Sequence, residues 1–518
     1  MNSRFASDSR HSRILTVALW LLLAASITKL WLVQLPSSFW VDEMVTAFVV
    51  AHPGDPSFAD APQVPQSIYY ALPEVAQKWF GTSEIAYRIP SELAMAIALL
   101  LIGWLAARLI HPQAGWFVVF TCFGLRGINY HAGDARPYAL GIAVAAAALC
   151  FLVRWLDAAH WLDAAAFVLF ASLLWRVHLI YWPFYLVFAI YPLVRLLTHE
   201  TSVKWTYALA VFGVLAVTLI PVAISAIKLQ RAAGAHVITE VPDFRSFEHE
   251  IRWTFVAICG GSAWLVGRLL GWLRPEPVSR ASVSRSSLTL IAAWWLGQPL
   301  VLFLYSHLTG NSVFIGRYVS IAVPGTALAA TAVAASFIPA NRWRVAALAL
   351  GIGVLAVAGQ WQTRWPRHDN SDWRAAAQEV NRLTLDNETP VIVPSPFVEA
   401  RSPVWTPDYH LPGFLYSHLP FYPLKGKIYL FPFEKKDGQE YARQLTAGTL
   451  SSTGRFLIYG GDRNVKYWTG WFAAQPELTG WTNRIEKFGD VEVGVLMKHS
   501  TPDVGGTPVS LLKLESTE

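Results

Sequence analysis

Acidic residues lie where an apolar run of the chain ends. Asp42 and Glu43 follow that run directly, within the segment Phe39–Glu43 (FWVDE). A charged group at the edge of a bilayer is costly unless it is paired or has a function. Two adjacent carboxylates also repel, which favours a proton on one of them. The pair could therefore supply a general base. The alternative is an ordinary solvated helix end.

A second polar cluster stands between two apolar runs, at Asn129–Tyr138 (NYHAGDARPY). Pro137 suits the first turn of a helix, so Arg136 is expected just before a helix N-terminus. A guanidinium beside free backbone N–H groups favours an anion, and phosphate is the natural guest. The alternative is an arginine that reaches the interface beside a capping Asp134.

Two more arginines lie near the expected starts of apolar segments. Arg317 precedes Tyr318 and Pro324, and Arg88 precedes Pro90 by two residues. Cations at helix starts on one side of a membrane attract an anionic headgroup. Each arginine alone would be unremarkable, but the three together with the carboxylate pair indicate a binding site.

Histidines at helix ends offer a metal site as an alternative. The histidines at such positions are His52, His131, His178 and His307. They could join one carboxylate of the acidic pair, but no HExxH-like spacing is present. The sequence therefore predicts no metal site and no required cofactor, and it leaves a divalent metal open. No Walker A motif is present, which argues against an ATP-driven transporter.

Composition places the chain in a membrane. Of its 518 residues, 54% are hydrophobic and only 15% are charged, and the mean hydropathy is +0.37. A soluble protein of this length needs more charge to cover its surface. The 24 tryptophans agree, since indole rings favour bilayer interfaces. The net charge of +6 suits anionic lipid headgroups and not nucleic acid.

Apolar segments of spanning length, about 20 residues, recur as far as residue 362. We expect about eleven transmembrane helices, at 14–35, 91–110, 113–129, 137–156, 161–177, 180–197, 205–227, 251–273, 288–307, 317–338 and 343–362. They form an α-helical polytopic membrane domain over residues 1–362.

The orientation is predicted from the basic residues, which favour the cytoplasmic side. The N-terminal arginines fit that side, as does one loop with Arg268, Arg274, Arg280 and Arg285. The expected outer loops are then 36–90 and 228–250. Everything after residue 363 lies on the same outer side, which also holds most of the acidic residues.

The last part of the chain has a different character. Asp372–Leu383 has the composition of a helix, and short strand-like runs follow, separated by Pro and Gly. These runs are Pro390–Pro394, Lys427–Phe433, Arg455–Tyr459 and Val491–Met497. We predict a soluble α/β domain over residues 363–518, on the periplasmic side.

The chain resembles a known family in an ordered set of segments. These are Trp40–Glu43 (WVDE), Pro65–Tyr70 (PQSIYY), Gly81–Ser91 (GTSEIAYRIPS), Ala135–Leu140 (ARPYAL) and Gly316–Tyr318 (GRY), followed by Pro324. Their order and spacing over residues 14 to 362 resemble the protein O-mannosyltransferase and aminoarabinose (lipid A) transferase group of GT-C membrane glycosyltransferases. The tail from Asp372 is similar to the soluble domain of bacterial members. No single segment is specific, whereas the ordered set is.

The resemblance implies a polyprenyl-monophosphate sugar donor and an inverting transfer to an extracytoplasmic acceptor. Asp42 would be the general base, and Glu43 would bind acceptor or hold the surroundings of Asp42. Donor phosphate would be bound by Arg136 and Arg317, with Arg88 as a further candidate. The residues expected to line the substrate site are Trp40, Tyr69, Tyr70, His131, Asp134, Tyr138 and Tyr318. For the aromatic rings, interfacial anchoring is the alternative.

Two other functions remain open at this point. A transporter or flippase for a lipid-linked glycan would also use a charged membrane cleft, although the hydropathy pattern shows no repeat between halves. A non-catalytic envelope assembly protein would leave Asp42, Arg136 and Arg317 unexplained. In each case the expected location is the bacterial inner membrane, and the acceptor could be a glycolipid, a polysaccharide or a protein.

Overall fold

The computed structural model describes residues 2–59, 61–62, 64–232, 240–269, 271, 283–359 and 367–498. The chain divides into two compact units. Unit 1 comprises Met1–Ser37, Val49–Pro53 and Pro62–His368, and unit 2 comprises Ser38–Phe48, Gly54–Ala61 and Asp369–Glu518. Two stretches of the expected outer loop 36–90 thus belong to the compact unit of the C-terminal region.

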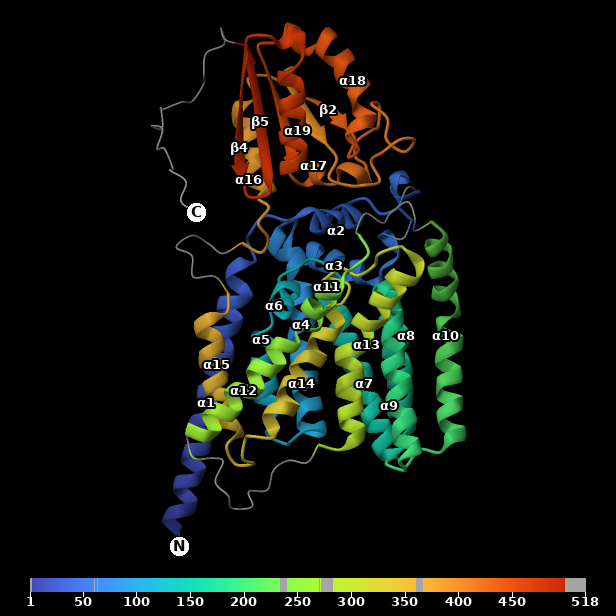
Figure 1. The fold of residues 1–518 in the computed structure, drawn as a ribbon, viewed down its shortest axis with the longest axis vertical. Helices are drawn as coiled ribbons and strands as arrows, with labels where there is room; N and C mark the ends of the chain where they lie inside the picture. Colours follow the sequence, from blue (N-terminus) through green and yellow to red (C-terminus); the bar gives the residue numbers. More distant parts are fainter. Residues whose placement is uncertain are drawn as a thin grey trace. The chain divides into compact units, whose positions relative to one another are not determined.

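Unit 1 is helical (Figure 1). Its helices are α1 (Asn2–Leu30), α3 (Ala71–Phe80), α4 (Glu84–Leu109), α5 (Gly115–Phe123), α6 (Arg126–Ala132), α7 (Tyr138–Ala158), α8 (Trp161–Val177), α9 (Tyr185–Leu197), α10 (Trp205–Ala232), α11 (Phe244–Ile251), α12 (Trp253–Leu269), α13 (Arg285–Thr309), α14 (Val323–Ala335) and α15 (Trp343–Val357). Helix α2 (Val41–Ala51) begins in unit 2 and ends in unit 1.

Helix α7 is the most buried of the long helices, and it packs between α4 and α8. Its run of alanines leaves room for neighbouring backbones, which is how helices associate in membranes. Gly141 is needed there, because a Cβ at this position would lie 2.3 Å from the ring of Tyr181. Gly325 has the same role between α14 and α13, where a Cβ would lie 2.4 Å from the backbone nitrogen of Trp295.

The described residues include six helices that are long and apolar enough to cross a membrane, and three shorter apolar helices. The unit is therefore a multi-pass membrane domain, but the predicted count of about eleven spans is not confirmed. Arg274 and Arg280, used above for orientation, lie outside the described residues. So do residues 233–239 of the expected outer loop 228–250.

Three expected spans differ from the structure for local reasons. Helix α4 begins at Glu84 and not at residue 91, because the Ser83 side chain caps it by accepting from the Ala86 N–H. The expected span 113–129 consists of two short helices, α5 and α6. The expected span 317–338 becomes α-helical only at Val323, because Pro324 fits best in a first helical turn.

Unit 2 contains a five-stranded sheet in the order β2-β1-β3-β5-β4. The strands are β1 (Pro390–Pro394), β2 (Lys427–Phe431), β3 (Arg455–Gly461), β4 (Trp481–Phe488) and β5 (Val491–Lys498). Strand β1 pairs in parallel with β2 and β3, whereas β5 pairs antiparallel with β3 and β4. Strand β4 was not expected, because it is a largely polar and half-exposed edge strand.

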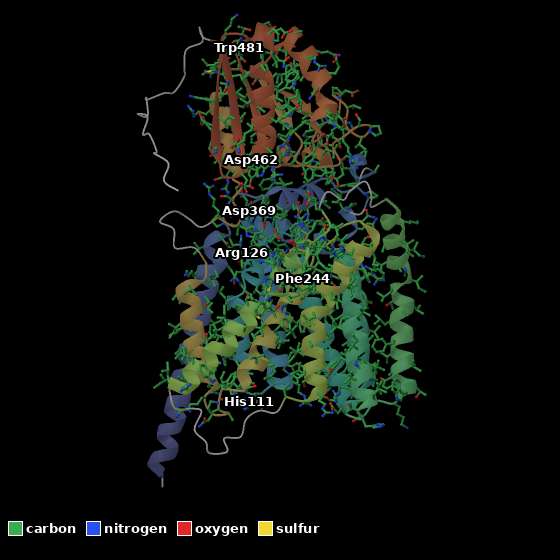
Figure 2. All side chains as sticks on the ribbon, in the orientation of Figure 1. His111, Arg126, Phe244, Asp369, Asp462 and Trp481 are labelled. Atoms are coloured by element: carbon green, nitrogen blue, oxygen red, sulfur yellow. The ribbon has the colours of Figure 1, made fainter. Side chains whose placement is uncertain are left out.

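Helices cover both faces of this sheet. They are α16 (Trp373–Leu383), α17 (His418–Phe421), α18 (Lys435–Gly448) and α19 (Asp462–Ala473). Phe456 and Ile458 of β3 join a buried cluster with α18 and α19, whereas Tyr459 faces Trp373 of α16 at 5.4 Å between ring centroids. Alternate residues of a strand point to opposite faces, so α16 lies opposite α18 and α19. The α/β character predicted for this region is confirmed, and Figure 2 labels Asp462 and Trp481 within it.

Candidate anion site

The predicted polar cluster 129–138 lies on α6, on the turn that follows it and at the start of α7. The indole Nε1 of Trp31 donates to Asn129 Oδ1 at 3.1 Å, and the Asn129 amide donates to the Phe123 carbonyl at 2.7 Å. The Arg136 N–H donates to the Asp134 carbonyl at 2.7 Å. Helix α7 begins two residues later, so Arg136 stands just before a helix N-terminus, as the sequence predicts.

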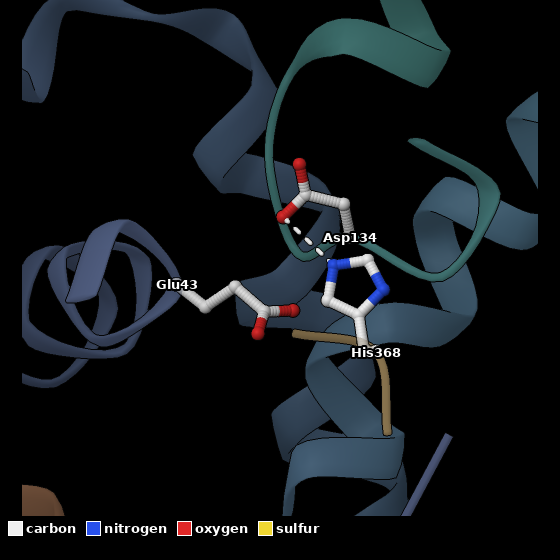
Figure 3. A group of neighbouring side chains, drawn as sticks. All are labelled: Glu43, Asp134 and His368. Atoms are coloured by element: carbon white, nitrogen blue, oxygen red, sulfur yellow. Dashed lines mark ion pairs between the residues drawn. The ribbon is translucent and has the colours of Figure 1, made fainter. Parts of the chain in front are cut away.

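Asp134 is completely buried between two histidines. Its Oδ2 lies 3.6 Å from His131 Nδ1, and its Oδ1 lies 3.8 Å from His368 Nε2, the contact drawn in Figure 3. The His368 ring also stacks on Tyr130, with 4.3 Å between ring centroids. Burial opposes the charge of Asp134, but the two imidazoles outweigh it and hold the pKa of the carboxyl below its ordinary value. Burial lowers the pKa of His131, although the neighbouring Asp134 carboxylate acts in the opposite direction.

His178 brings the two predicted phosphate-binding arginines together. Burial first, and then the charges of Arg136 and Arg317, lower the pKa of His178 to about 3. Two guanidinium groups about 180 positions apart in the sequence therefore act on one half-buried ring. The Nδ1 of His178 accepts from the Ile180 N–H at 3.2 Å, so this neutral ring carries its proton on Nε2. We call the surroundings of Arg136, His178 and Arg317 the candidate anion site.

Tyrosine rings surround His178. Tyr138 stacks on it at 5.8 Å between centroids, and Tyr181 and Tyr318 lie at 5.7 and 5.5 Å. The Arg317 guanidinium lies 5.6 Å from the Tyr318 ring centre, which favours the cation. Tyr138 and Tyr318 were both predicted to line the site, and the structure brings them together.

Tyr69 reaches the same region through a hydrogen-bonded serine. Its hydroxyl lies 3.0 Å from Ser91 Oγ, and that oxygen donates to the Arg136 carbonyl at 3.3 Å. Tyr69 is fully buried, and Tyr70 beside it is half-buried with its ring 5.9 Å away. Tyr69 thus supports the backbone of the arginine.

Arg88 lies in a different setting from the other two arginines. It is fully buried on α4, and its Nη1 donates to the carbonyls of Leu35 and Ser37, both at 2.8 Å, and to Ser37 Oγ at 3.1 Å. The His368 N–H donates to the same Ser37 Oγ at 3.1 Å. Ser37 and His368 are two of the residues at which the chain leaves unit 1. Arg88 therefore fixes the segment that leads to the acidic pair.

An arginine that the sequence analysis missed belongs to this region of unit 1. Arg252 follows α11 in the left-handed conformation, with φ of 51°, and its Nη2 lies 3.5 Å from Glu250 Oε2. Burial lowers its pKa, and its charge contributes to the lowered pKa of His131. Gly316 makes room for the pair, because a Cβ there would lie 3.0 Å from Glu250 Oε1. Arg252 was missed because it falls at the edge of an expected span.

The acidic pair lies in unit 2. Asp42 and Glu43 occupy the first turn of α2, where the helix dipole favours negative charge. Glu43 is buried and its Oε2 accepts from the Trp40 N–H at 3.3 Å, whereas Asp42 and Trp40 are half-buried. Glu43 thus accepts a hydrogen bond at the start of α2.

Residues of the C-terminal domain contact the segment that leads into α2. The Phe39 N–H donates to the Tyr422 hydroxyl at 2.9 Å, and the Phe39 ring lies 4.8 Å from that of Phe421. The Arg374 N–H donates to Ser38 Oγ at 3.2 Å. These contacts explain why the stretch 38–48 belongs to unit 2. No local sequence pattern predicted them.

Comparison of the sequence with protein-family models and with curated proteins gave no match. The structure, in contrast, is similar to two solved structures of ArnT from Cupriavidus metallidurans. The apo form matches with a TM-score of 0.50 and 10% identity, over 94% of this chain and 98% of ArnT. The form bound to undecaprenyl phosphate matches with a TM-score of 0.50 and 11% identity, over 93% and 98%. The chain therefore has the fold of ArnT, an aminoarabinose lipid A transferase of the GT-C type, as its ordered segments predict.

Proposed function

We propose that the chain is an inverting glycosyltransferase that moves a sugar from a polyprenyl-monophosphate donor to an extracytoplasmic acceptor. The observation that supports this most is the packing of Tyr138 and Tyr318 around His178. Arg136, two positions before the first tyrosine, and Arg317, directly before the second, both lower the pKa of that histidine. Two half-buried cations suit a phosphate and give it more stabilisation than they would in open water. The ArnT fold, of which one structure holds undecaprenyl phosphate, agrees with such a donor.

In the proposed reaction, an acceptor hydroxyl oxygen attacks the anomeric carbon. The bond between that carbon and the phosphate oxygen breaks, and the polyprenyl phosphate leaves with the electron pair. Asp42 takes the proton of the hydroxyl, and Arg136 and Arg317 stabilise the negative charge of the leaving phosphate. No general acid and no cofactor are needed, because the phosphate leaves as a stable anion.

Other residues have supporting roles in this proposal. Glu43 holds the start of α2 through the Trp40 N–H. Tyr138 and Tyr318 offer faces on which a sugar or isoprenoid can stack, and Trp40, Tyr69, Tyr70, His131 and Asp134 complete the proposed lining. A phosphate contact of Arg88 stays a proposal, beside its bonds to Ser37. The proposed location is the bacterial inner membrane, with the site and the C-terminal domain on the periplasmic side.

The test is mass spectrometry of envelope glycans and lipids from a deletion strain, complemented with wild type or with Asp42→Asn. We expect one fixed sugar mass to vanish on deletion and to return only with wild type, which also identifies the acceptor. Loss of a general base should lower turnover by about 10²–10⁴-fold. Full restoration by Asp42→Asn would remove the base from the proposal and favour a transporter of lipid-linked glycans.

A further inference from the structure

His418 is the first residue of α17, and it is completely buried inside unit 2. Three aromatic rings surround it. Trp373 of α16 lies at 4.9 Å between ring centroids, Tyr459 of β3 at 5.8 Å, and Tyr416, just before α17, at 6.4 Å. Among the residues that the structure describes, none is a hydrogen-bond partner of either ring nitrogen of His418. A buried polar group without a hydrogen bond is unfavourable, and a buried charge without a partner is far more so.

The surroundings of His418 oppose a second proton on its ring. The titratable side chains that face it are the phenols of Tyr416 and Tyr459, whose hydroxyls donate to backbone carbonyls at 2.6 and 3.3 Å. Burial lowers the pKa of His418 to about 3. Asp372 and Arg374, the charged residues at the start of α16, do not oppose this shift. The ring is therefore neutral in the folded domain.

Elements that pack against His418 also hold the segment that leads into α2. The Tyr422 hydroxyl, directly after α17, accepts from the Phe39 N–H at 2.9 Å, and the Tyr422 N–H donates to the His418 carbonyl at 2.9 Å. From the first turn of α16, the Arg374 N–H donates to Ser38 Oγ at 3.2 Å. Movement of His418 into water would thus break α17 and remove its hydrogen bond to Phe39.

We propose that His418 is a pH switch: when its ring takes up a second proton, α17 opens and releases the segment that leads into α2. An imidazolium is stable in water but not between three aromatic rings, so acid favours the open form.

The size of the effect follows from linkage. Because the pKa of His418 is about 3 in the closed form and about 6.5 for a solvated histidine, the opening constant should rise about 25-fold between pH 7 and pH 5. The switch lies within unit 2. Only its consequence for turnover rests on the proposed function, since α2 carries Asp42.

The test is hydrogen–deuterium exchange of the purified full-length protein at pH 7 and pH 5, with rates corrected for the intrinsic pH dependence of exchange. We expect the opening constant of the Phe39 amide to rise about 25-fold in the wild type. His418→Phe keeps an aromatic ring that cannot be protonated, so it should remove this rise. His410→Gln, at an exposed histidine nearby in the sequence, should keep it.

Amides of β3, inside the sheet, report whether the opening is local. They should stay protected at both pH values, and a parallel loss of their protection would overturn the proposal in favour of unfolding of the whole domain. An equal rise in the wild type and in His418→Phe would also overturn it. Should His418→Phe fail to fold, His418→Gln is likewise uncharged and should also remove the rise.

Sugar transfer provides a separate measurement. Between pH 7 and pH 5, turnover should fall less in His418→Phe than in the wild type. Absence of sugar transfer in both proteins would count against the proposed function, whereas the exchange result alone decides whether His418 is a switch.

Discussion

The two units hold their carboxylates in different ways. Asp134 of unit 1 is completely buried between His131 and His368, which hold its pKa below the ordinary value. Asp42 of unit 2 is half-buried in the first turn of a helix. A carboxylate whose proton affinity is lowered by two neighbours is a poor base, so Asp134 is suited to ordering its turn. This difference favours Asp42 over Asp134 as the proposed base.

The cations show a second difference between the units. In unit 1, Arg136 and Arg317 act on the half-buried His178 and Arg252 acts on the buried His131. In unit 2, the segment before the acidic helix is held by contacts with Tyr422 and Phe421. In the proposed reaction, leaving-group stabilisation thus depends on unit 1 and proton removal on unit 2. Substitutions in unit 1 should therefore weaken donor binding as well as turnover, whereas substitutions in unit 2 should lower turnover alone.

The largest effect expected in unit 1 follows from Arg136→Gln or Arg317→Gln. Either change removes one cation from the proposed phosphate site, which should lower turnover by about 10²–10³-fold. Binding of undecaprenyl phosphate to the purified protein should also weaken, as measured by ligand-dependent thermal stabilisation. The exposed Arg126→Gln, at the start of α6, is the matched control. Unchanged binding in both variants would contradict the phosphate site.

A smaller effect is expected in unit 2 from Tyr422→Phe. The change removes the acceptor of the Phe39 N–H, whose unmade bond costs about 1–3 kcal/mol of unfolding free energy. Because α2 begins two residues later, we expect turnover to fall about ten-fold while binding of undecaprenyl phosphate is unchanged. Tyr441→Phe on α18 is the control. Weaker lipid binding without loss of turnover would contradict the proposal that unit 1 stabilises the leaving group and unit 2 removes the proton.

The smallest effect concerns pH. The pKa of His178 is lowered to about 3, so between that value and about 6.5 the unfolded chain binds a proton that the folded protein does not. Stability should then fall as pH drops below about 6.5, with a slope of up to ~1.4 kcal/mol per pH unit. Between pH 7 and pH 5 Asp134 adds almost nothing, because its contribution is lost only as pH falls through the ordinary range of an aspartate and lower.

Thermal unfolding in detergent between pH 7 and pH 5 measures this slope. His178→Gln should flatten it in part, since the lowered pKa of His131 gives a slope of the same sign. The exposed His249→Gln should leave the slope as in the wild type. An unchanged slope in His178→Gln would show that the folded protein does not lower the pKa of His178.

Local sequence signals predicted much of the fold but few of the contacts. Arg136 was expected before a helix because Pro137 suits a helix start, and β1, β3 and β5 were expected from short apolar runs between Pro and Gly. These signals depend only on neighbouring residues. Strand β4 was not predicted, because its alternation of polar and apolar residues is weak and its place in the sheet depends on pairing with β5.

By itself, the sequence determined that the chain is a membrane protein with an α/β tail, and which polar residues lie at helix ends. Hydropathy, proline and glycine act locally, so these features can be read without a fold. Only the tertiary structure decided that Arg136 and Arg317 meet at His178, that His368 reaches Asp134, and that residues 38–48 belong with the C-terminal domain. Those partners are about 40 to 380 residues apart, and chain packing alone sets their distance.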